Sequence, residues 1–184
     1  MRIAIAGPPG SGKSTVCQLV AQKMGYDLVL VGQIFRQIAA ERRIDLAVFN
    51  RMAQEDETID RELDKRMVDL AKAKQDIVIE GRLPGILLKI QKVPCVAVFV
   101  HADEKVRAER IAQREQKPVE QVLRENISRE ASERKRYKAY YGVDARDRSY
   151  YDVWVDSTSI SAEEVSDIIV QEARARDAEA ARKG

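Results

Sequence analysis

A chain of 184 residues is long enough for one domain with a full hydrophobic core and too short for two domains of ordinary size. Its 32 Lys and Arg residues nearly balance its 30 Asp and Glu residues, and the net charge of +2 argues against a dedicated nucleic-acid or membrane-surface protein. Apolar residues make up 45% of the chain and charged residues 34%, which is typical of a folded globular domain rather than a disordered one.

The chain shows no targeting or metal-binding pattern. No apolar run approaches the ~20 residues that a membrane span needs, and the N-terminus begins on an apolar strand pattern with no secretory segment. Cys17 and Cys95 lie in apolar runs, where cysteine usually acts as a small buried hydrophobe. His101 is the only histidine, which gives little support to His-based catalysis. We therefore expect a cytoplasmic protein.

Taken in order, the chain alternates strand patterns with helix patterns. Short apolar runs predict strands at 2–6, 27–31, 76–80, 94–100 and 151–155. Helical spacing predicts helices at 13–24, 33–43, 45–53, 58–73, 104–115 and 119–141, and one that starts at 161. Asp45 and Thr58 are candidate N-caps, and Ser161 opens a capping box with Glu163 and Glu164 in the first turn. The charged tail at 171–184 has lost its apolar face and predicts a fraying helical extension.

This alternation predicts the fold class. Strands that alternate with helices form a three-layer α/β fold around a central parallel five-stranded sheet, with right-handed crossovers. The sequence contains no internal repeat and no linker-like segment. We therefore expect one domain over residues 1–184.

The strongest motif lies between the first strand and the first helix. Gly7, Gly12, Lys13 and Ser14 match G-x-x-x-x-G-K-[ST], the phosphate-binding loop (P-loop) of nucleotide-binding proteins. The glycines let backbone N–H groups surround a phosphate, Lys13 brings a charge to the β- and γ-phosphates, and Ser14 offers a hydroxyl to Mg²⁺. The alternative, a glycine-rich structural turn, does not explain why all the fixed residues are present. The residues that we expect to bind ATP are Gly7, Pro8, Pro9, Gly10, Ser11, Gly12, Lys13, Ser14 and Thr15.

The arginines indicate which kind of P-loop protein this is. The sequence has neither N-K-x-D nor D-x-x-G of guanine-nucleotide switches, and no L-S-G-G-Q of transporters. Arginines instead occur at separated points, namely Arg36, Arg82, Arg107, Arg110, Arg114, Arg124, Arg129, Arg134 and Arg136. Transfer of a phosphoryl group between two nucleotides needs such charges, because two polyphosphates must approach each other. The alternative for those on the helices at 104–141 is a solvated surface, whereas Arg82 follows a strand end where α/β sheets bind ligands.

On these residues the chain resembles a nucleoside monophosphate (NMP) kinase, and most closely the archaeal type of cytidylate kinase. The resemblance covers residues 1 to about 170. It is carried by GPPGSGKST, VGQIFR, EGRLPG, RAERIAQRE, SREASERKRYKAYYGVD and YDVWVDSTSISAEEV. It implies a P-loop NTPase fold with NMP-binding helices at about 33–65 and a mobile lid at about 115–141.

The resemblance also implies roles for particular residues. The residues implied in catalysis are Lys13, Arg110, Arg114, Arg129 and Arg136. Those implied in binding the acceptor are Gln33, Arg36, Gly81, Arg82 and Glu133. Mg²⁺ is implied at Ser14 and, through water, at Glu80.

Two positions depart from the family pattern. Many archaeal relatives have G-T-T-T where this chain has the general P-loop form, Gly12 to Thr15. Gln33 stands where the family usually has an aspartate, which puts in doubt what that aspartate contributes to substrate choice.

The reaction expected is transfer of the γ-phosphate of ATP to CMP, and also to dCMP, with release of ADP. The expected partners are small nucleotides, with no nucleic acid and no membrane, and the expected state is a monomer. Three alternatives remain open from the sequence: a kinase of AMP or UMP, a P-loop ATP-binding regulatory protein, and a kinase of a small metabolite.

Overall fold

A parallel five-stranded sheet forms the centre of the computed structural model, which describes residues 1–183. Its strands are β1 (Arg2–Ala6), β2 (Asp27–Leu30), β3 (Ile77–Gly81), β4 (Val96–His101) and β5 (Val153–Asp156). They lie in the order β2-β3-β1-β4-β5. The C-terminal residue of β1, Ala6, pairs with Gly81 on one side and with Phe99 on the other. The P-loop and the segments that follow β3 and β4 therefore meet at one edge of the sheet, where α/β proteins bind ligands.

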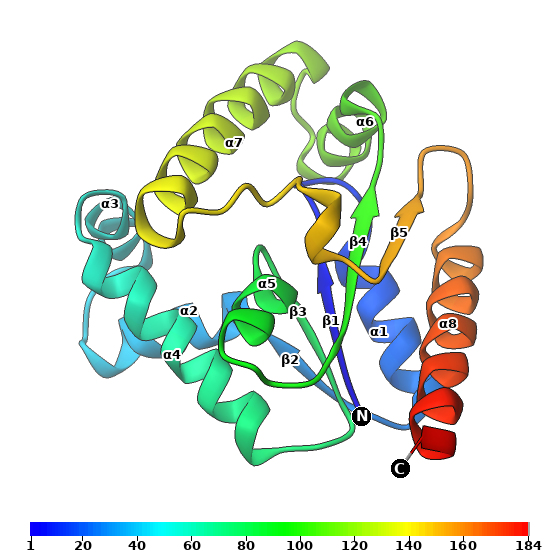
Figure 1. Cartoon of the computed structure of the whole chain (residues 1–184). Helices are drawn as coiled ribbons and strands as arrows, with labels where there is room; N and C mark the ends of the chain where they lie inside the picture. Colours follow the sequence, from blue (N-terminus) through cyan, green and yellow to red (C-terminus); the bar gives the residue numbers. More distant parts are fainter. Residues whose placement is uncertain (184) are drawn as a thin grey trace.

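Helices cover both faces of this sheet (Figure 1). The helices are α1 (Lys13–Met24), α2 (Val31–Glu41), α3 (Leu46–Glu55), α4 (Glu57–Ala73), α5 (Pro84–Ile90), α6 (Glu104–Glu115), α7 (Val119–Tyr141) and α8 (Ala162–Lys183), with a 3₁₀ turn at Arg148–Tyr150. Helices α1 and α8 lie side by side on one face, and α5 packs on the other with α4 beyond it. This arrangement confirms the predicted three-layer α/β fold.

Alternation along the strands divides the core into two clusters. Successive side chains of a strand point to opposite faces, so Ile3 and Ile5 pack toward α1 and α8 while Ala4 packs toward α5. Helix α5 approaches the sheet at this point: a Cβ at Gly85 would lie 2.7 Å from Cβ of Ala97 on β4 and 3.7 Å from Cβ of the neighbouring Ala4. Small residues at these three positions allow α5 to approach the sheet closely.

Helices α6 and α7 lie over the C-terminal edge of the sheet, and α7 extends from α6 to α3 (Figure 1). A small apolar cluster of Ala108, Ile111, Ala112 and Val122 joins α6 to the first turns of α7. At the other end, Arg136 Nη1 donates to Asp60 Oδ2 of α4 (2.9 Å) and to the carbonyl oxygen of Ala53 in α3 (3.0 Å). Helix α7 is therefore anchored at both ends.

Most predicted elements are present, and the differences have local causes. Helix α2 begins at Val31, two residues before the predicted start at residue 33, and therefore contains Gly32. Asp56, rather than Thr58, caps α4, because its Oδ1 accepts from the backbone N–H of Thr58 (2.9 Å). The capping box is confirmed, since Ser161 N donates to Glu164 (2.8 Å) and Glu164 N donates back to Ser161 Oγ (3.2 Å). Helix α5 was not predicted.

The predicted charged tail at 171–184 forms the last turns of α8, with Gly184 outside the described residues. Ala173 is fully buried, and Arg176 Nη2 donates to the carbonyl oxygen of Asp152 (2.8 Å). The start of the tail therefore packs on the sheet layer, which the loss of periodicity did not predict. Both cysteines are free, with Cys17 buried and Cys95 half-buried. Within residues 1–183, no helix has the length and apolar character that crossing a membrane requires.

Asp64 on α4 makes the stability of the α4–α7 contact depend on pH. Its carboxylate accepts a hydrogen bond from the Tyr141 hydroxyl of α7. Burial raises the pKa of Asp64 from 3.8 to about 6, although the bond from Tyr141 acts in the opposite direction. The folded state therefore holds this proton to higher pH than the unfolded state, so stability falls as pH rises from about 4 to about 6.

Asp64→Asn is therefore expected to stabilise the protein above pH 6, by about 1–2 kcal/mol at pH 7.5. The amide oxygen still accepts from Tyr141 and carries no charge to desolvate. Denaturant unfolding at pH 4 and pH 7.5 measures the effect, which should disappear at pH 4. Asp69→Asn, on an exposed face of the same helix, is the control. An equal difference at both pH values would contradict the assignment.

Candidate active site

The loop between β1 and α1 is built around glycines. Gly10 and Gly12 have φ of +79° and +82°, in the left-handed region that favours glycine. A Cβ at Gly7 would lie 2.5 Å from the carbonyl oxygen of Val100, and one at Gly10 would lie 2.5 Å from that of Arg107. Gly12 is also the N-cap of α1, so the positive end of the helix dipole faces the loop. This loop can hold a phosphate with its backbone N–H groups.

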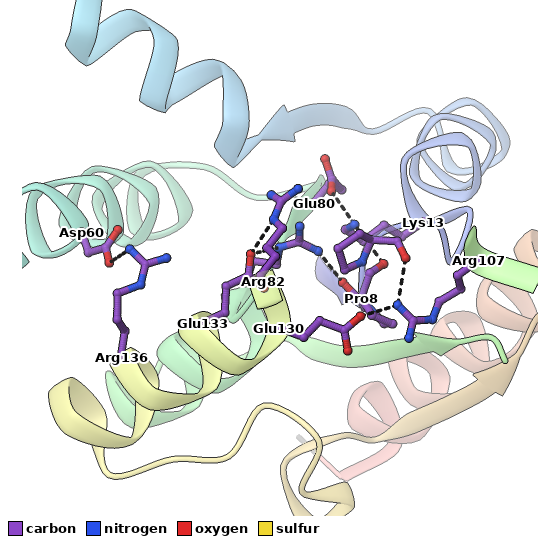
Figure 2. A network of polar contacts seen from close by, with 12 residues as sticks. Pro8, Lys13, Asp60, Glu80, Arg82, Arg107, Glu130, Glu133 and Arg136 are labelled. Carbon is purple, nitrogen blue, oxygen red and sulfur yellow. Dashed lines mark hydrogen bonds and ion pairs between the residues drawn. The ribbon is translucent and has the colours of Figure 1, made fainter. Parts of the chain in front are cut away.

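Lys13 lies below this loop with only 8% of its surface exposed. Its Nζ is 3.6 Å from Glu80 Oε1 at the end of β3 and 3.5 Å from the carbonyl oxygen of Pro8 (Figure 2). Burial, and then the nearby Arg82, lower the pKa of Lys13 from 10.5 to about 8, and Glu80 offsets this only in part. The negative charge of Glu80 therefore does not fully offset the cost of burying the Lys13 ammonium, and an added anion would stabilise that ammonium.

A cavity of about 290 Å³ opens above the P-loop, and we call it the P-loop cavity. The P-loop and the start of α1 form its floor, while α6 and α7 form its roof. Four cationic side chains line it: Lys13, Arg82, Arg114 and Arg129. Two carboxylates, Glu115 and Glu125, line it as well, so the positive charges outnumber the negative ones. This excess of positive charge beside the phosphate-binding loop suits a polyphosphate.

Glu133 of α7 holds two of these arginines (Figure 2). Its Oε1 is 3.2 Å from Arg82 Nε and accepts from Arg129 Nε (3.0 Å). Arg82 Nη1 also donates to the carbonyl oxygen of Gly7 (3.1 Å), which ties the end of β3 to the P-loop. One carboxylate thus gathers two guanidinium groups at the edge of the P-loop cavity, where phosphate oxygens could bind them as well.

Other predicted residues do not line the P-loop cavity. Arg110 Nη2 donates to the carbonyl oxygen of Ser157 after β5 (2.7 Å), and its Nη1 lies beside the P-loop, 4.0 Å from where a Cβ of Gly12 would be. Arg136 binds Asp60 and Ala53, away from the P-loop (Figure 2). Gln33 and Arg36 are exposed on α2, and neither lines the P-loop cavity. Gly81 contacts α2, because a Cβ there would lie 3.0 Å from Val31 Cγ2.

Arg107 is a buried residue that the sequence reasoning did not assign to the site. It is 4% exposed, and its guanidinium donates to the carbonyl oxygens of Pro9 (3.1 Å) and Ala102 (3.0 Å). It also pairs with Glu130 of α7 (Figure 2), and Glu130 in turn pairs with Arg146. Arg107 therefore connects the P-loop backbone to α7. Its helical spacing from Arg110 and Arg114 was the available signal.

A second cavity of about 650 Å³ lies on the other side of Arg82, between α7 and the ends of β4 and β5. Phe99 and Trp154 stack in its wall, with ring centroids 4.2 Å apart, and Arg148 lies over the Trp154 ring. Tyr137 and His101 complete its aromatic lining. Its residues come from five separate segments of the chain, at 7–8, 82, 99–107, 127–148 and 154, so no local pattern in the sequence predicted it.

The residues at the P-loop fit a magnesium ion that arrives with a nucleotide. Mg²⁺ usually keeps several waters and takes one or two protein oxygens together with substrate phosphates. Ser14 is exposed at the start of α1, beside Lys13, which lies next to the Glu80 carboxylate. Over residues 1–183, no group of three or more His, Cys, Asp or Glu side chains could hold a metal ion by itself. The two predicted oxygen donors therefore suit Mg²⁺ bound through ATP.

The sheet order, the P-loop after β1 and the arginine-lined cavity define a P-loop kinase. Solved structures with this fold include an uncharacterised protein from Eubacterium ventriosum, with a TM-score of 0.73 and 16% identity over 95% of this chain and 98% of that one. A shikimate kinase from Acinetobacter baumannii has a TM-score of 0.60 and 17% identity over 92% of this chain and 90% of its own. A gluconokinase from Sinorhizobium meliloti has a TM-score of 0.61 and 20% identity over 99% and 94%.

Within that class, the chain belongs to the cytidylate kinase-like family, whose model matches residues 2–159. A cytidylate kinase of Halorubrum lacusprofundi is 43% identical over 92% of this chain and 88% of its own length. The cytidylate kinase of Archaeoglobus fulgidus is 39% identical over 93% of both chains. That of Methanococcus maripaludis is 40% identical over 92% of this chain and 95% of its own.

Proposed function

We propose that the protein transfers the γ-phosphate of ATP to CMP, and also to dCMP, giving CDP or dCDP and ADP. Membership of the cytidylate kinase-like family supports this assignment. The structural observation that carries it is the convergence of Lys13, Arg82 and Arg129 on the P-loop cavity under α7. The sequence-based expectations of a monomer and of a cytoplasmic location remain predictions.

The chemistry that we propose is mostly positioning and charge neutralisation. A phosphate oxygen of the acceptor forms the new bond to the γ-phosphorus of ATP, and the bond from that phosphorus to ADP breaks. Lys13 and the P-loop N–H groups hold the donor phosphates, while Arg82 and Arg129 neutralise charge between donor and acceptor. Helix α7, which roofs the P-loop cavity, excludes water that would otherwise hydrolyse ATP.

The remaining assignments are proposals that rest on the family resemblance. The residues proposed in catalysis are Lys13, Arg110, Arg114, Arg129 and Arg136. Those proposed for the acceptor are Gln33, Arg36, Gly81, Arg82 and Glu133, with residues 33–65 as the acceptor-binding region and 115–141 as the lid. Ser14, and Glu80 through water, would hold Mg²⁺, which supplies positive charge to the phosphate oxygens.

The test of this proposal is kcat/KM for CMP, dCMP, UMP, AMP and GMP at fixed Mg-ATP. CMP and dCMP are expected to exceed the others at least about tenfold, because a site that accepts from the cytosine amino group leaves a buried group unpaired when UMP enters. AMP at least tenfold ahead of CMP would instead identify an adenylate kinase. ATP hydrolysis that no monophosphate stimulates would identify a regulatory ATP-binding protein.

A further inference from the structure

The inner face of α7 changes from apolar to polar along the helix. Val122, fully buried against α6, is followed on the same face by four polar positions at helical spacing: Asn126, Arg129 with Glu130, Glu133 and Arg136. Three of the four have ionic partners, because Arg129 pairs with Glu133, Glu130 with Arg107, and Arg136 with Asp60. Figure 2 shows the pair of Glu130 with Arg107 and the pair of Arg136 with Asp60 along α7. Asn126 is the exception.

Asn126 is buried without a partner for its amide nitrogen. Its residue surface is 5% exposed, and Nδ2 has no hydrogen-bond acceptor among the residues that the structure describes. A buried donor without an acceptor costs folding free energy. Val122, one turn earlier, shows that the same face accommodates an apolar side chain. The stability of the free protein therefore gives no reason for an amide at this position.

The position of Asn126 in the P-loop cavity suggests why the residue is an amide. It lines the P-loop cavity together with Lys13 and Ser14, from the opposite wall. It also lies one helical turn before Arg129, so both side chains come from the same face of α7. The apolar contacts between α6 and the start of α7 hold the helix above the P-loop, which fixes the backbone position of Asn126 before any ligand binds.

We propose that Asn126 is a further catalytic residue, whose carboxamide Nδ2 donates a hydrogen bond to an oxygen of the γ-phosphoryl group of ATP. This inference rests on the proposed function and adds a residue to the same site. Lys13, Arg82, Arg114 and Arg129 supply charge in the P-loop cavity. Asn126 supplies a neutral donor, which gains an acceptor only when the γ-phosphoryl group is present.

The test uses Asn126→Leu, which approximates the volume of the side chain, and Asn126→Ala. Ser128→Ala, at an exposed position two residues along α7, is the control. Three quantities are measured: the melting temperature of the free protein, the Kd values of ATP and ADP without any acceptor, and kcat with CMP. The ratio of the two Kd values isolates the contribution of the γ-phosphoryl group.

In the Asn126→Leu variant, the free protein is expected to melt at the wild-type temperature or above it. ADP binding should stay within about twofold, whereas ATP binding should weaken about tenfold, as for a hydrogen bond to a charged group. We expect kcat to fall by about 10- to 100-fold. Asn126→Ala should show the same loss of ATP preference, and Ser128→Ala should match the wild type throughout.

Equal weakening of ATP and ADP, together with a lower melting temperature in both Asn126 variants, would show a structural role and overturn the inference. Wild-type values of kcat and of the Kd ratio in a folded variant would overturn it as well. The binding measurement involves no acceptor, so it separates this inference from the proposed function. If CMP is not phosphorylated by the wild type but the ATP preference still depends on Asn126, only the acceptor assignment fails.

Discussion

Replacing Lys13 by alanine or methionine is expected to lower kcat by on the order of 10² or more without loss of stability. A charge at the β- and γ-phosphates is stabilising chiefly in the transition state, so its loss appears in kcat. The side chain of Lys13 lies beside Glu80, and only 8% of the residue's surface is exposed. Because burial holds the pKa of Lys13 down to about 8, the charged form is costly in the free protein. Removing the charge therefore relieves that cost.

Lys13→Met keeps most of the side-chain volume, so it separates the charge from the packing. The measurements are kcat at saturating CMP and ATP and the melting temperature of the free enzyme. Lys23→Met is the control, since Lys23 lies at the far end of α1 and pairs with Asp167 (2.6 Å) and Glu163 (2.8 Å) of α8. Near wild-type kcat in a Lys13 variant that melts normally would refute the assignment.

The sequence predicted the P-loop because its residues are contiguous. Gly7 to Thr15 determine a local backbone shape, and the flanking strand and helix follow from short patterns. The position of Arg82 was also predictable, since residues that follow a strand of a parallel sheet collect at its C-terminal edge. The first prediction depends on residues that are adjacent in the sequence, and the second depends on a general rule of parallel-sheet topology.

The features that the sequence did not predict arise from distant contacts or from very short elements. Helix α5 has seven residues, too few for a periodic pattern, and its Pro84-Gly85 start is also typical of a turn. Arg136 pairs with Asp60, 76 positions away, although the family resemblance implied a role at the phosphates. The burial of Asn126 depends on how α7 packs over the P-loop, which no single segment encodes.

Helix α7 connects the parts of the site that must act together. Val122 packs on α6, Glu130 reaches the P-loop through Arg107, and Arg136 with Tyr141 binds α4. A displacement of α7 would change the roof of the P-loop cavity and its contact with α4 in one movement. This geometry supports the proposal that residues 115–141 act as a lid over both substrates.

Arg82 has the most connected position of the predicted acceptor residues. It lines both the P-loop cavity and the second cavity, and it contacts Gly7 and Glu133. Arg36, in contrast, is exposed on α2, with its Nη1 3.7 Å from where a Cβ of Gly32 would lie. The two arginines share a proposed role, but only the side chain of Arg82 is held in place by contacts with the P-loop and α7.

Arg82→Ala is expected to lower kcat/KM for CMP roughly 30- to 1000-fold, which corresponds to a loss of about 2–4 kcal/mol of transition-state stabilisation. The KM for ATP should change little. The guanidinium can bind the acceptor phosphate at two oxygens, which Arg82→Lys cannot reproduce, so the lysine variant should recover only part of the loss. Arg36→Ala is expected to show the same separation between the two substrates. Titrating CMP and ATP separately measures it, with Arg124→Ala, an exposed arginine of α7, as the control. An effect confined to the KM for ATP would show that both arginines bind the donor nucleotide, and would contradict the placement of the acceptor at the end of β3.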